Sequence, residues 1–168
     1  MNRGKGKDTV RLAFASIKNF DPRHFKNEKA AWIKDCIKKH EIDGVGGAEA
    51  GINCWEVMPR PGRLSNLLRA TEDMRSVAAF NWHETLNIKQ WGGTFMCTYG
   101  RLAGRTTETG TDTSGLGRWC WMKFRGKNNI TTRIIAVCVP RRGEGLTTVF
   151  GQQQRCFETT GETRITKQ

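Results

Sequence analysis

A glycine-rich run that ends in one acid is the feature that most restricts the fold of this chain. It reads Ile42-Asp43-Gly44-Val45-Gly46-Gly47-Ala48-Glu49, and its residues up to Ala48 are mostly small or apolar. Short runs of this kind are typical of strands that are buried on both faces of a sheet. The pattern therefore predicts an inner strand over 42–48 that carries the Glu49 carboxylate to the rim of a sheet.

The residues before this run predict a strand and then a helix. A strand is expected over Val10–Ile17, because apolar side chains alternate along it. Those side chains are Val10, Leu12 and Phe14. A helix is expected over Glu28–His40, where apolar residues form one stripe and basic residues lie at the end. A right-handed crossover would place both strands in one sheet, so Ser16 and Glu49 are expected near the same strand ends.

Strands dominate the rest of the sequence. They are expected over 75–81, 94–99, 102–108, 119–125 and 130–139, and the last two form a hairpin around a Gly/Asn turn. A short helix is expected over 64–71, and another helix over 148–158. Many strands with about three helices indicate an α+β fold, either a layered β-sandwich or half of one.

The positive charge of the chain favours a polyanionic partner. The formal net charge is +12 and the isoelectric point is near 9.9, and such a surplus favours phosphate-rich partners through counterion release. The basic residues recur in pairs near predicted loops: Arg60 and Arg63, Arg101 and Arg105, Arg125 and Lys127, Arg141 and Arg142. This distribution predicts a phosphate-facing rim and DNA or RNA as the partner, with simple solubility as the alternative.

Length, hydropathy and cysteine spacing limit the other possibilities. The 168 residues are expected to form one domain over 10–161, between a basic arm over 1–9 and a polar tail over 162–168. No apolar run approaches the roughly 18 residues of a membrane span. The six cysteines include no Cys-x-x-Cys pair, so there is no zinc signal. Reduced cysteines in an intracellular compartment, nuclear or cytoplasmic, are expected.

Several motifs resemble, in order, those of the endonuclease/exonuclease/phosphatase superfamily, which has the deoxyribonuclease-I-like fold. The run from Asp43 to Glu49 is similar to the family strand that ends in a metal-binding glutamate, and Val10 to Phe20 resembles its first strand and asparagine-bearing loop. The motifs that follow are Gly92-Gly93-Thr94, Ser114-Gly115-Leu116-Gly117-Arg118-Trp119, Arg125-Gly126-Lys127-Asn128-Asn129 and Gln152-Gln153-Gln154-Arg155. Their combination resembles the nuclease-like domains that accompany reverse transcriptases in retroelements.

The resemblance implies a Mg²⁺-dependent endonuclease with Glu49 as catalytic residue and metal ligand. It implies a catalytic role also for Ser16, which stands where the family has asparagine, and phosphate contacts from Lys18 and Arg141. The family's later Asp-x-Asn loop and Ser-Asp-His ending, which supplies the general base, have no counterpart here. The resemblance thus implies that the chain is the N-terminal half of a four-layer fold. It implies a divergent or truncated phosphodiesterase whose catalysis is impaired when this chain is alone.

Two other functions stay open from the sequence. The first is a basic nucleic-acid-binding module without chemistry, in which tryptophans stack on unpaired bases. The tryptophans considered for this role, with core packing as the alternative, are Trp55, Trp82 and Trp91. The second is an interaction fragment. Because half of a sandwich leaves an apolar face or a sheet edge uncovered, a second polypeptide or a second copy of the chain would complete it.

Overall fold

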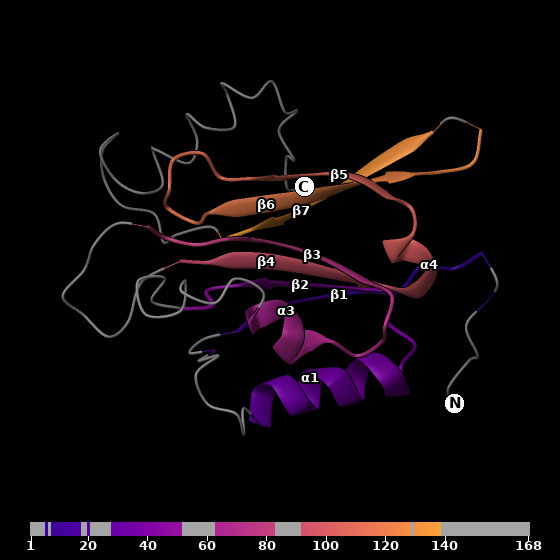
Figure 1. The fold of residues 1–168 in the computed structure, drawn as a ribbon, viewed down its shortest axis with the longest axis horizontal. Coiled ribbons are helices and arrows are strands. Elements are labelled where there is room, and N and C mark those ends of the chain that lie inside the picture. The colour runs from indigo at the N-terminus through magenta and orange to yellow at the C-terminus, as the bar shows by residue number, and fades with distance from the viewer. Residues whose placement is uncertain are drawn as a thin grey trace, which may run out of the picture.

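The computed structural model describes residues 6, 8–17, 20, 28–51, 63–82, 92–128 and 130–138. Two β-sheets lie face to face, and the helices α1 (Glu28–Lys39) and α3 (Arg63–Leu68) cover the free face of the larger sheet (Figure 1). The content is mixed and mostly strand, which confirms the α+β class. No helix in these described ranges is long and apolar enough to cross a membrane.

The larger sheet contains four strands in the order β1-β2-β4-β3. β1 (Leu12–Ser16) is parallel to β2 (Gly44–Ala48). β4 (Thr94–Tyr99) is antiparallel to β2 and to β3 (Met74–Ala79). The chain therefore opens with a strand, a helix and a second strand parallel to the first, which confirms the predicted crossover. In the sequence α1 connects β1 to β2.

The smaller sheet contains three antiparallel strands in the order β5-β6-β7. They are β5 (Thr106–Thr111), β6 (Trp119–Arg125) and β7 (Thr131–Val137). The pairing of β6 with β7 confirms the predicted hairpin. The strand expected over 102–108 is wrong in its first part, because the short helix α4 (Gly100–Ala103) occupies those residues. Gly100 has a φ of +52°, which turns the chain out of β4 toward the smaller sheet.

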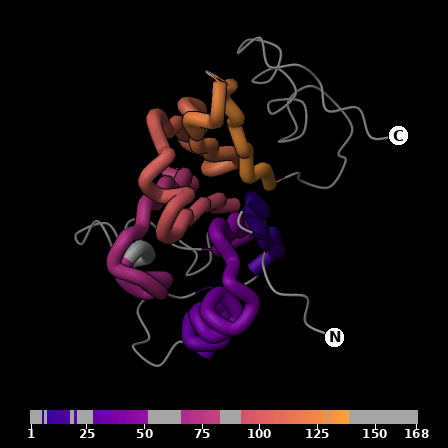
Figure 2. Tube along the Cα trace, turned by 90° about the vertical axis from the view of Figure 1, so that its right-hand side faces the viewer, coloured from indigo at the N-terminus to yellow at the C-terminus, as the bar shows by residue number. Residues whose placement is uncertain are grey.

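Two apolar cores hold the layers together, and Figure 2 shows the layers from the side. The first core lies between the helices and the larger sheet. Its large, fully buried side chains include Phe20, Leu68 and Phe95, and the rings of Phe20 and Phe95 are 6.2 Å apart. The second core lies between the two sheets and consists of Ala79, Met96, Leu102, Cys120, Met122, Phe124 and Ala136.

The glycines of β2 allow aromatic rings to approach its backbone. A Cβ atom at Gly47 would collide with the ring of Phe95, and one at Gly46 would collide with the ring of Phe14. Phe95 is fully buried in the first core, so its ring cannot swing out into solvent. Close packing against Phe95 therefore requires a residue without a Cβ atom at position 47, and Phe14 packs over Gly46 on the other face.

We expect the Gly47→Ala substitution to lower the free energy of unfolding by about 2 kcal/mol, because it overpacks the site against Phe95. Gly104→Ala is the matched control. The nearest atom to a Cβ at Gly104 is 3.8 Å away, and its φ of −65° suits alanine. Urea denaturation of the two variants measures the difference, and equal midpoints would contradict the close contact between β2 and Phe95.

Candidate functional site

Glu49 and Ser16 lie together at one rim of the larger sheet. Because β1 and β2 are parallel, their carboxyl ends meet at the same edge. Ser16 is the last residue of β1, and Glu49 directly follows β2. The Ser16 hydroxyl donates a hydrogen bond to the Glu49 carboxylate, with 2.6 Å between Oγ and Oε2. The structure thus brings the two side chains together, as the predicted crossover required.

The backbone at Glu49 has an unusual conformation. Its φ is +57°, in the left-handed region that residues other than glycine seldom adopt. Hydrogen bonds fix the chain on both sides of it. The Ile17 N–H donates to the Ala48 carbonyl over 2.8 Å, and the Ala50 N–H donates to the Gly93 carbonyl over 3.2 Å. A strained backbone conformation of this kind persists where neighbouring contacts stabilise it, as these hydrogen bonds do here. The Glu49 side chain is exposed at the rim.

A groove of about 370 Å³ extends from this rim between β1 and β7. Ser16 and Glu49 line it together with Phe14 and Cys138. The rest of the lining consists of Ala15, Gly46, Gly47, Ala48, Ala136 and Val137. The groove is therefore mainly apolar, and Glu49 contributes the one carboxylate of its described lining.

The described residues do not by themselves make up a Mg²⁺ site. No group of three or more His, Cys, Asp or Glu side chains that could hold a metal occurs among them. Mg²⁺ demands octahedral oxygen coordination, and proteins commonly supply one or two carboxylates beside waters and phosphate oxygens. Glu49 offers one such carboxylate, and the neighbouring Ser16 hydroxyl gives its hydrogen to that same group.

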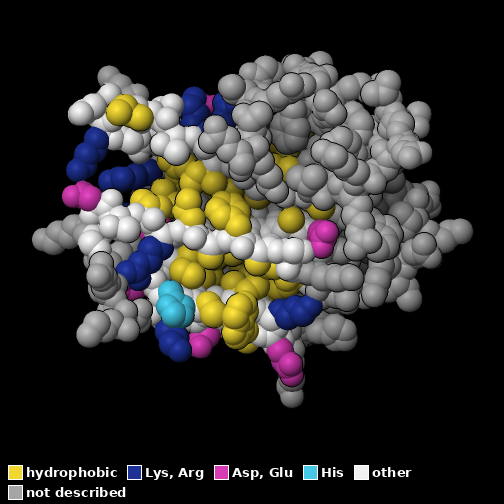
Figure 3. All heavy atoms as spheres, turned by 180° about the vertical axis from the view of Figure 1, so that it is seen from behind, with side chains coloured by type: hydrophobic (Ala, Val, Ile, Leu, Met, Phe, Trp, Pro, Cys, Tyr) yellow, Lys and Arg dark blue, Asp and Glu magenta, His cyan; other side chains and the backbone are white. Residues whose placement is uncertain are grey.

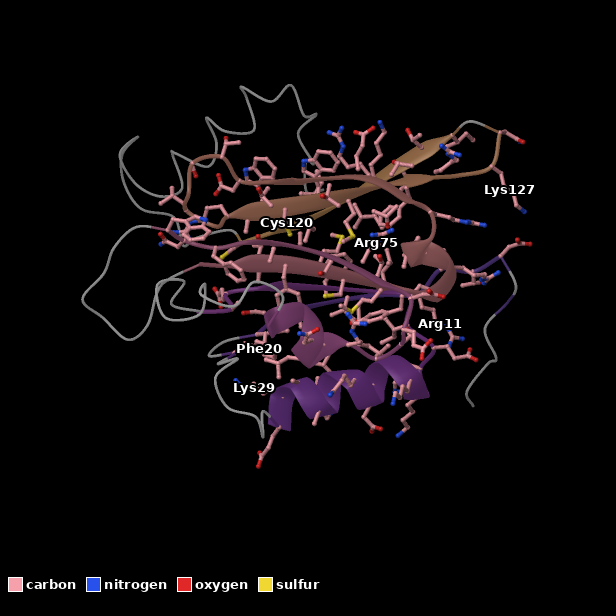
Figure 4. The ribbon with its side chains drawn as sticks, viewed as in Figure 1. Arg11, Phe20, Lys29, Arg75, Cys120 and Lys127 are labelled. Atoms are coloured by element: carbon pink, nitrogen blue, oxygen red, sulfur yellow. The ribbon has the colours of Figure 1, made fainter. Side chains whose placement is uncertain are left out.

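Basic side chains gather at the opposite end of the sheets. Arg101 lies on α4 and Arg105 follows it. Lys127 lies in the turn after β6, where Figure 4 labels it. The Tyr99 N–H donates to the Asp43 carbonyl over 2.8 Å, so α4 starts beside the first residues of β2. Five residues of strand, about 16 Å, separate that end from the Glu49 end. Of the expected basic rim, Arg101, Arg105 and Lys127 therefore lie far from the carboxylate.

This basic end also contains acidic side chains. A cavity of about 300 Å³ is lined there by Asp8 and Asp43 as well as by Arg101, Arg105 and Lys127. The Lys127 ammonium lies 3.3 Å from a carboxylate oxygen of Asp8, and both side chains are well exposed. Exposed pairs of this kind are weak, so Lys127 can exchange Asp8 for another anion.

Several residues named from the sequence lie outside the described ranges: Lys18, Arg141, Trp55 and Trp91. The helix expected over 148–158 also lies outside them. Trp82 is described, and its side chain is 44% exposed rather than packed in the core. It follows β3 at the Glu49 end of the sheets, because Ala79 and Ala48 both pair with Thr94.

Arg118 is a buried cation, to which the sequence analysis assigned no role beyond its place in a motif. It is 7% exposed, and its backbone N–H donates to the Asp112 carboxylate over 2.8 Å. Within the described chain its Nε atom has no hydrogen-bond partner. Arg118 lies at the Glu49 end, since the preceding Gly117 carbonyl accepts the Gly93 N–H. The sequence signal that could have pointed to this position is the Asp112-x-Ser114 turn, which precedes Arg118 and is held by hydrogen bonds from Ser114 to the Asp112 carboxylate.

The buried cysteines Cys97 and Cys120 belong to the core and not to the site. Burial raises the pKa of the Cys97 thiol and that of the Cys120 thiol to about 12 each. Neither forms a thiolate nucleophile at neutral pH. Burial also raises the pKa of Tyr99, whose hydroxyl donates to the Leu68 carbonyl over 3.0 Å. These groups therefore act as packing elements, as the apolar runs around the cysteines predicted.

Comparison with known proteins identifies the fold. No family model matches the sequence, and no curated protein matches it significantly. Among solved structures, the chain is similar to the 3′ phosphatase NExo from Neisseria bound to a product DNA hairpin, with a TM-score of 0.50 and 11% identity. The match covers 90% of this chain and 49% of that chain. At this identity the likeness concerns the fold alone, so the chain has a deoxyribonuclease-I-like arrangement over about half the length of that neighbour.

Proposed function

We propose that this chain is a divergent half-length domain of the Mg²⁺-dependent phosphodiesterase type that acts on or binds nucleic acid. It corresponds to the N-terminal half of the four-layer fold, similar to retroelement nuclease domains. Glu49 is the remaining position of its metal site, and catalysis is impaired in the chain alone. The observation that carries this proposal is the hydrogen bond between Ser16 and Glu49 at the ends of two parallel strands.

The geometry of this pair supports a ligand position for Glu49. The hydrogen bond from Ser16 fixes one carboxylate oxygen, Oε2. Hydrogen bonds of this kind orient carboxylates that ligate metals. The same contact also sets the orientation of the other oxygen, Oε1. Oε1 can then face a cation, either free or bound to a phosphate. Because the side chain is exposed at the rim, a ligand as large as a nucleic acid can reach it.

The same surroundings support impaired catalysis. Hydrolysis of a phosphodiester requires a base that activates water. No histidine lines the described part of the groove, and Glu49 is its one carboxylate. The single histidine within the described ranges, His40, follows α1 at the other end of the sheet. Among the described residues Glu49 has no partner group for hydrolysis, which fits a domain that binds nucleic acid without cutting it efficiently.

A nucleic-acid-binding module without chemistry is the second candidate. The net charge of +12 and the position of Arg101, Arg105 and Lys127 away from Glu49 favour it. Phosphate contacts at that end would not need the carboxylate. The exposed ring of Trp82 offers a stacking surface for an unpaired base. Both candidate functions have nucleic acid as the partner. They differ in whether Glu49 binds a metal ion that takes part in the function.

Manganese relaxation tests the role of Glu49 as a ligand position, with Mn²⁺ used in place of Mg²⁺. Low concentrations of Mn²⁺ should broaden the NMR signals of Ser16, Glu49 and Ala50 first, because a bound ion would lie at this rim. Glu49→Gln should abolish this selectivity, whereas Glu72→Gln, which changes an exposed acid near β3, should preserve it. Broadening that spreads over the exposed acids without favouring this rim would contradict the ligand position.

A plasmid-nicking assay tests the impairment. With Mg²⁺ present, the purified chain should nick supercoiled plasmid no faster than its Glu49→Ala variant, because the described site lacks a base. Gel electrophoresis over a long incubation measures the relaxed fraction. Nicking that depends on Glu49 would show that the chain is a complete nuclease.

Salt dependence tests the basic end. Affinity for a DNA oligonucleotide should fall about 100-fold between roughly 50 and 200 mM salt if about four phosphates are contacted. The double variant Arg105→Gln, Lys127→Gln should reduce the slope of log K against log salt by about 2. Lys29→Gln, Lys34→Gln on α1 removes the same charge and should change the slope less. Equal slopes for the two double variants would exclude the α4 end as the contact surface.

A further inference from the structure

β1 is an edge strand with an open row of backbone groups. In the order β1-β2-β4-β3, no described strand pairs with the side of β1 that faces away from β2. Toward β2, the Ile17 N–H donates to Ala48, and the Arg11 carbonyl accepts from Gly44. Backbone groups alternate along a strand, so those of the even-numbered residues point outward. These residues are Leu12, Phe14 and Ser16.

The same edge exposes large apolar side chains. Leu12 is 42% exposed and Phe14 is 53% exposed. Both lie on the face of the sheet that the second sheet covers elsewhere, above the glycines Gly44 and Gly46. Apolar residues at alternate strand positions normally face a core. Figure 3 views the molecule from behind, the side on which β1 lies, and shows apolar side chains gathered there.

The second sheet packs mainly on β2, β3 and β4, and much less on β1. β7 contacts β2 and β4, β6 contacts β3 and β4, and β5 contacts β3. The groove of about 370 Å³ lies where the layer would continue, between Phe14 on β1 and Ala136 on β7. The described chain thus leaves the inner face of β1 without a covering layer, directly beside an unpaired sheet edge. Exposed edges of this kind readily accept a further strand.

We propose that the outer edge of β1 is a docking site for a β-strand of a different polypeptide segment, supplied from outside these 168 residues. The strand forms backbone hydrogen bonds with Leu12, Phe14 and Ser16. Every second side chain of the docked strand is apolar. These side chains cover Leu12 and Phe14 and reach into the groove. This inference rests on the fold alone and does not depend on whether Glu49 holds a metal.

Two observations favour a different segment over a second copy of this chain. The structural match covers 90% of this chain but only 49% of the NExo chain, so in that neighbour as much polypeptide again accompanies this half. The formal net charge of +12 also makes two copies repel each other. A neutral or acidic strand meets no such repulsion. The docked strand therefore alternates apolar residues with polar ones, and its polar residues are neutral or acidic.

A peptide probe tests the docking site. The probe is the capped peptide Glu-Thr-Val-Thr-Val-Thr-Val-Thr-Glu, and its control has proline in place of the central valine, which removes a ladder donor. Amide hydrogen exchange is followed by NMR without metal or nucleic acid. At millimolar probe, the amides of Leu12, Phe14 and Ser16 should exchange about 10-fold more slowly. The proline peptide should leave their exchange unchanged.

Two surface variants locate the effect. Phe14→Lys places a charge in the proposed contact and should abolish the protection, whereas Trp32→Lys, at a residue of α1 that is 67% exposed, should retain it. Absence of protection at millimolar probe would overturn the proposal, as would equal protection by the proline peptide. Protection without any peptide that grows with protein concentration would assign the edge to a second copy instead. None of these outcomes depends on metal binding at Glu49.

Discussion

The parallel pairing of β1 with β2 is the constraint on which the rest of this structure depends. β2 carries almost no side chains, so rings can approach its backbone from both faces, Phe95 from the helix side and Phe14 from the other. With both of its faces packed, β2 can present a long polar side chain only beyond its end. Glu49 stands at that end, and the parallel direction of β1 brings Ser16 to the same rim. One short glycine-rich strand thus determines both the packing of the sheet and the place of the carboxylate.

Much of this arrangement could be predicted from local sequence signals. The glycine-rich run identified a buried strand, and the apolar stripe over 28–40 identified α1 almost to the residue. The errors arose where a contact between distant segments decides the structure. Leu102 has the pattern of a strand residue, but the chain must cross from one sheet to the other there, and it forms α4. The alternation of Leu12 and Phe14 predicted β1 correctly, but it cannot tell whether another layer covers them.

The site could be predicted only in part, for the same reason. The nearness of Ser16 and Glu49 follows from a crossover between neighbouring strands, which the sequence reveals. The distance of Arg101 and Lys127 from that pair follows from the antiparallel register of β4 with β2 and of β6 with β5. No local pattern encodes that register. Arg118 stands in one of the motifs named from the sequence but received no role of its own, because one arginine between a glycine and a tryptophan has no periodicity, although burial makes it distinctive.

The single carboxylate at the rim and the open apolar edge have one physical cause. A site at the end of a strand draws side chains from the neighbours on both sides of that strand. On one side of β1 lies β2, which brings Glu49 to Ser16. On the other side the described chain places no strand. The described residues therefore bring no further side chains to the rim from that side, and Leu12 and Phe14 stay exposed. A strand beside β1 would bury these two side chains and would also bring new side chains to the rim that holds Ser16 and Glu49.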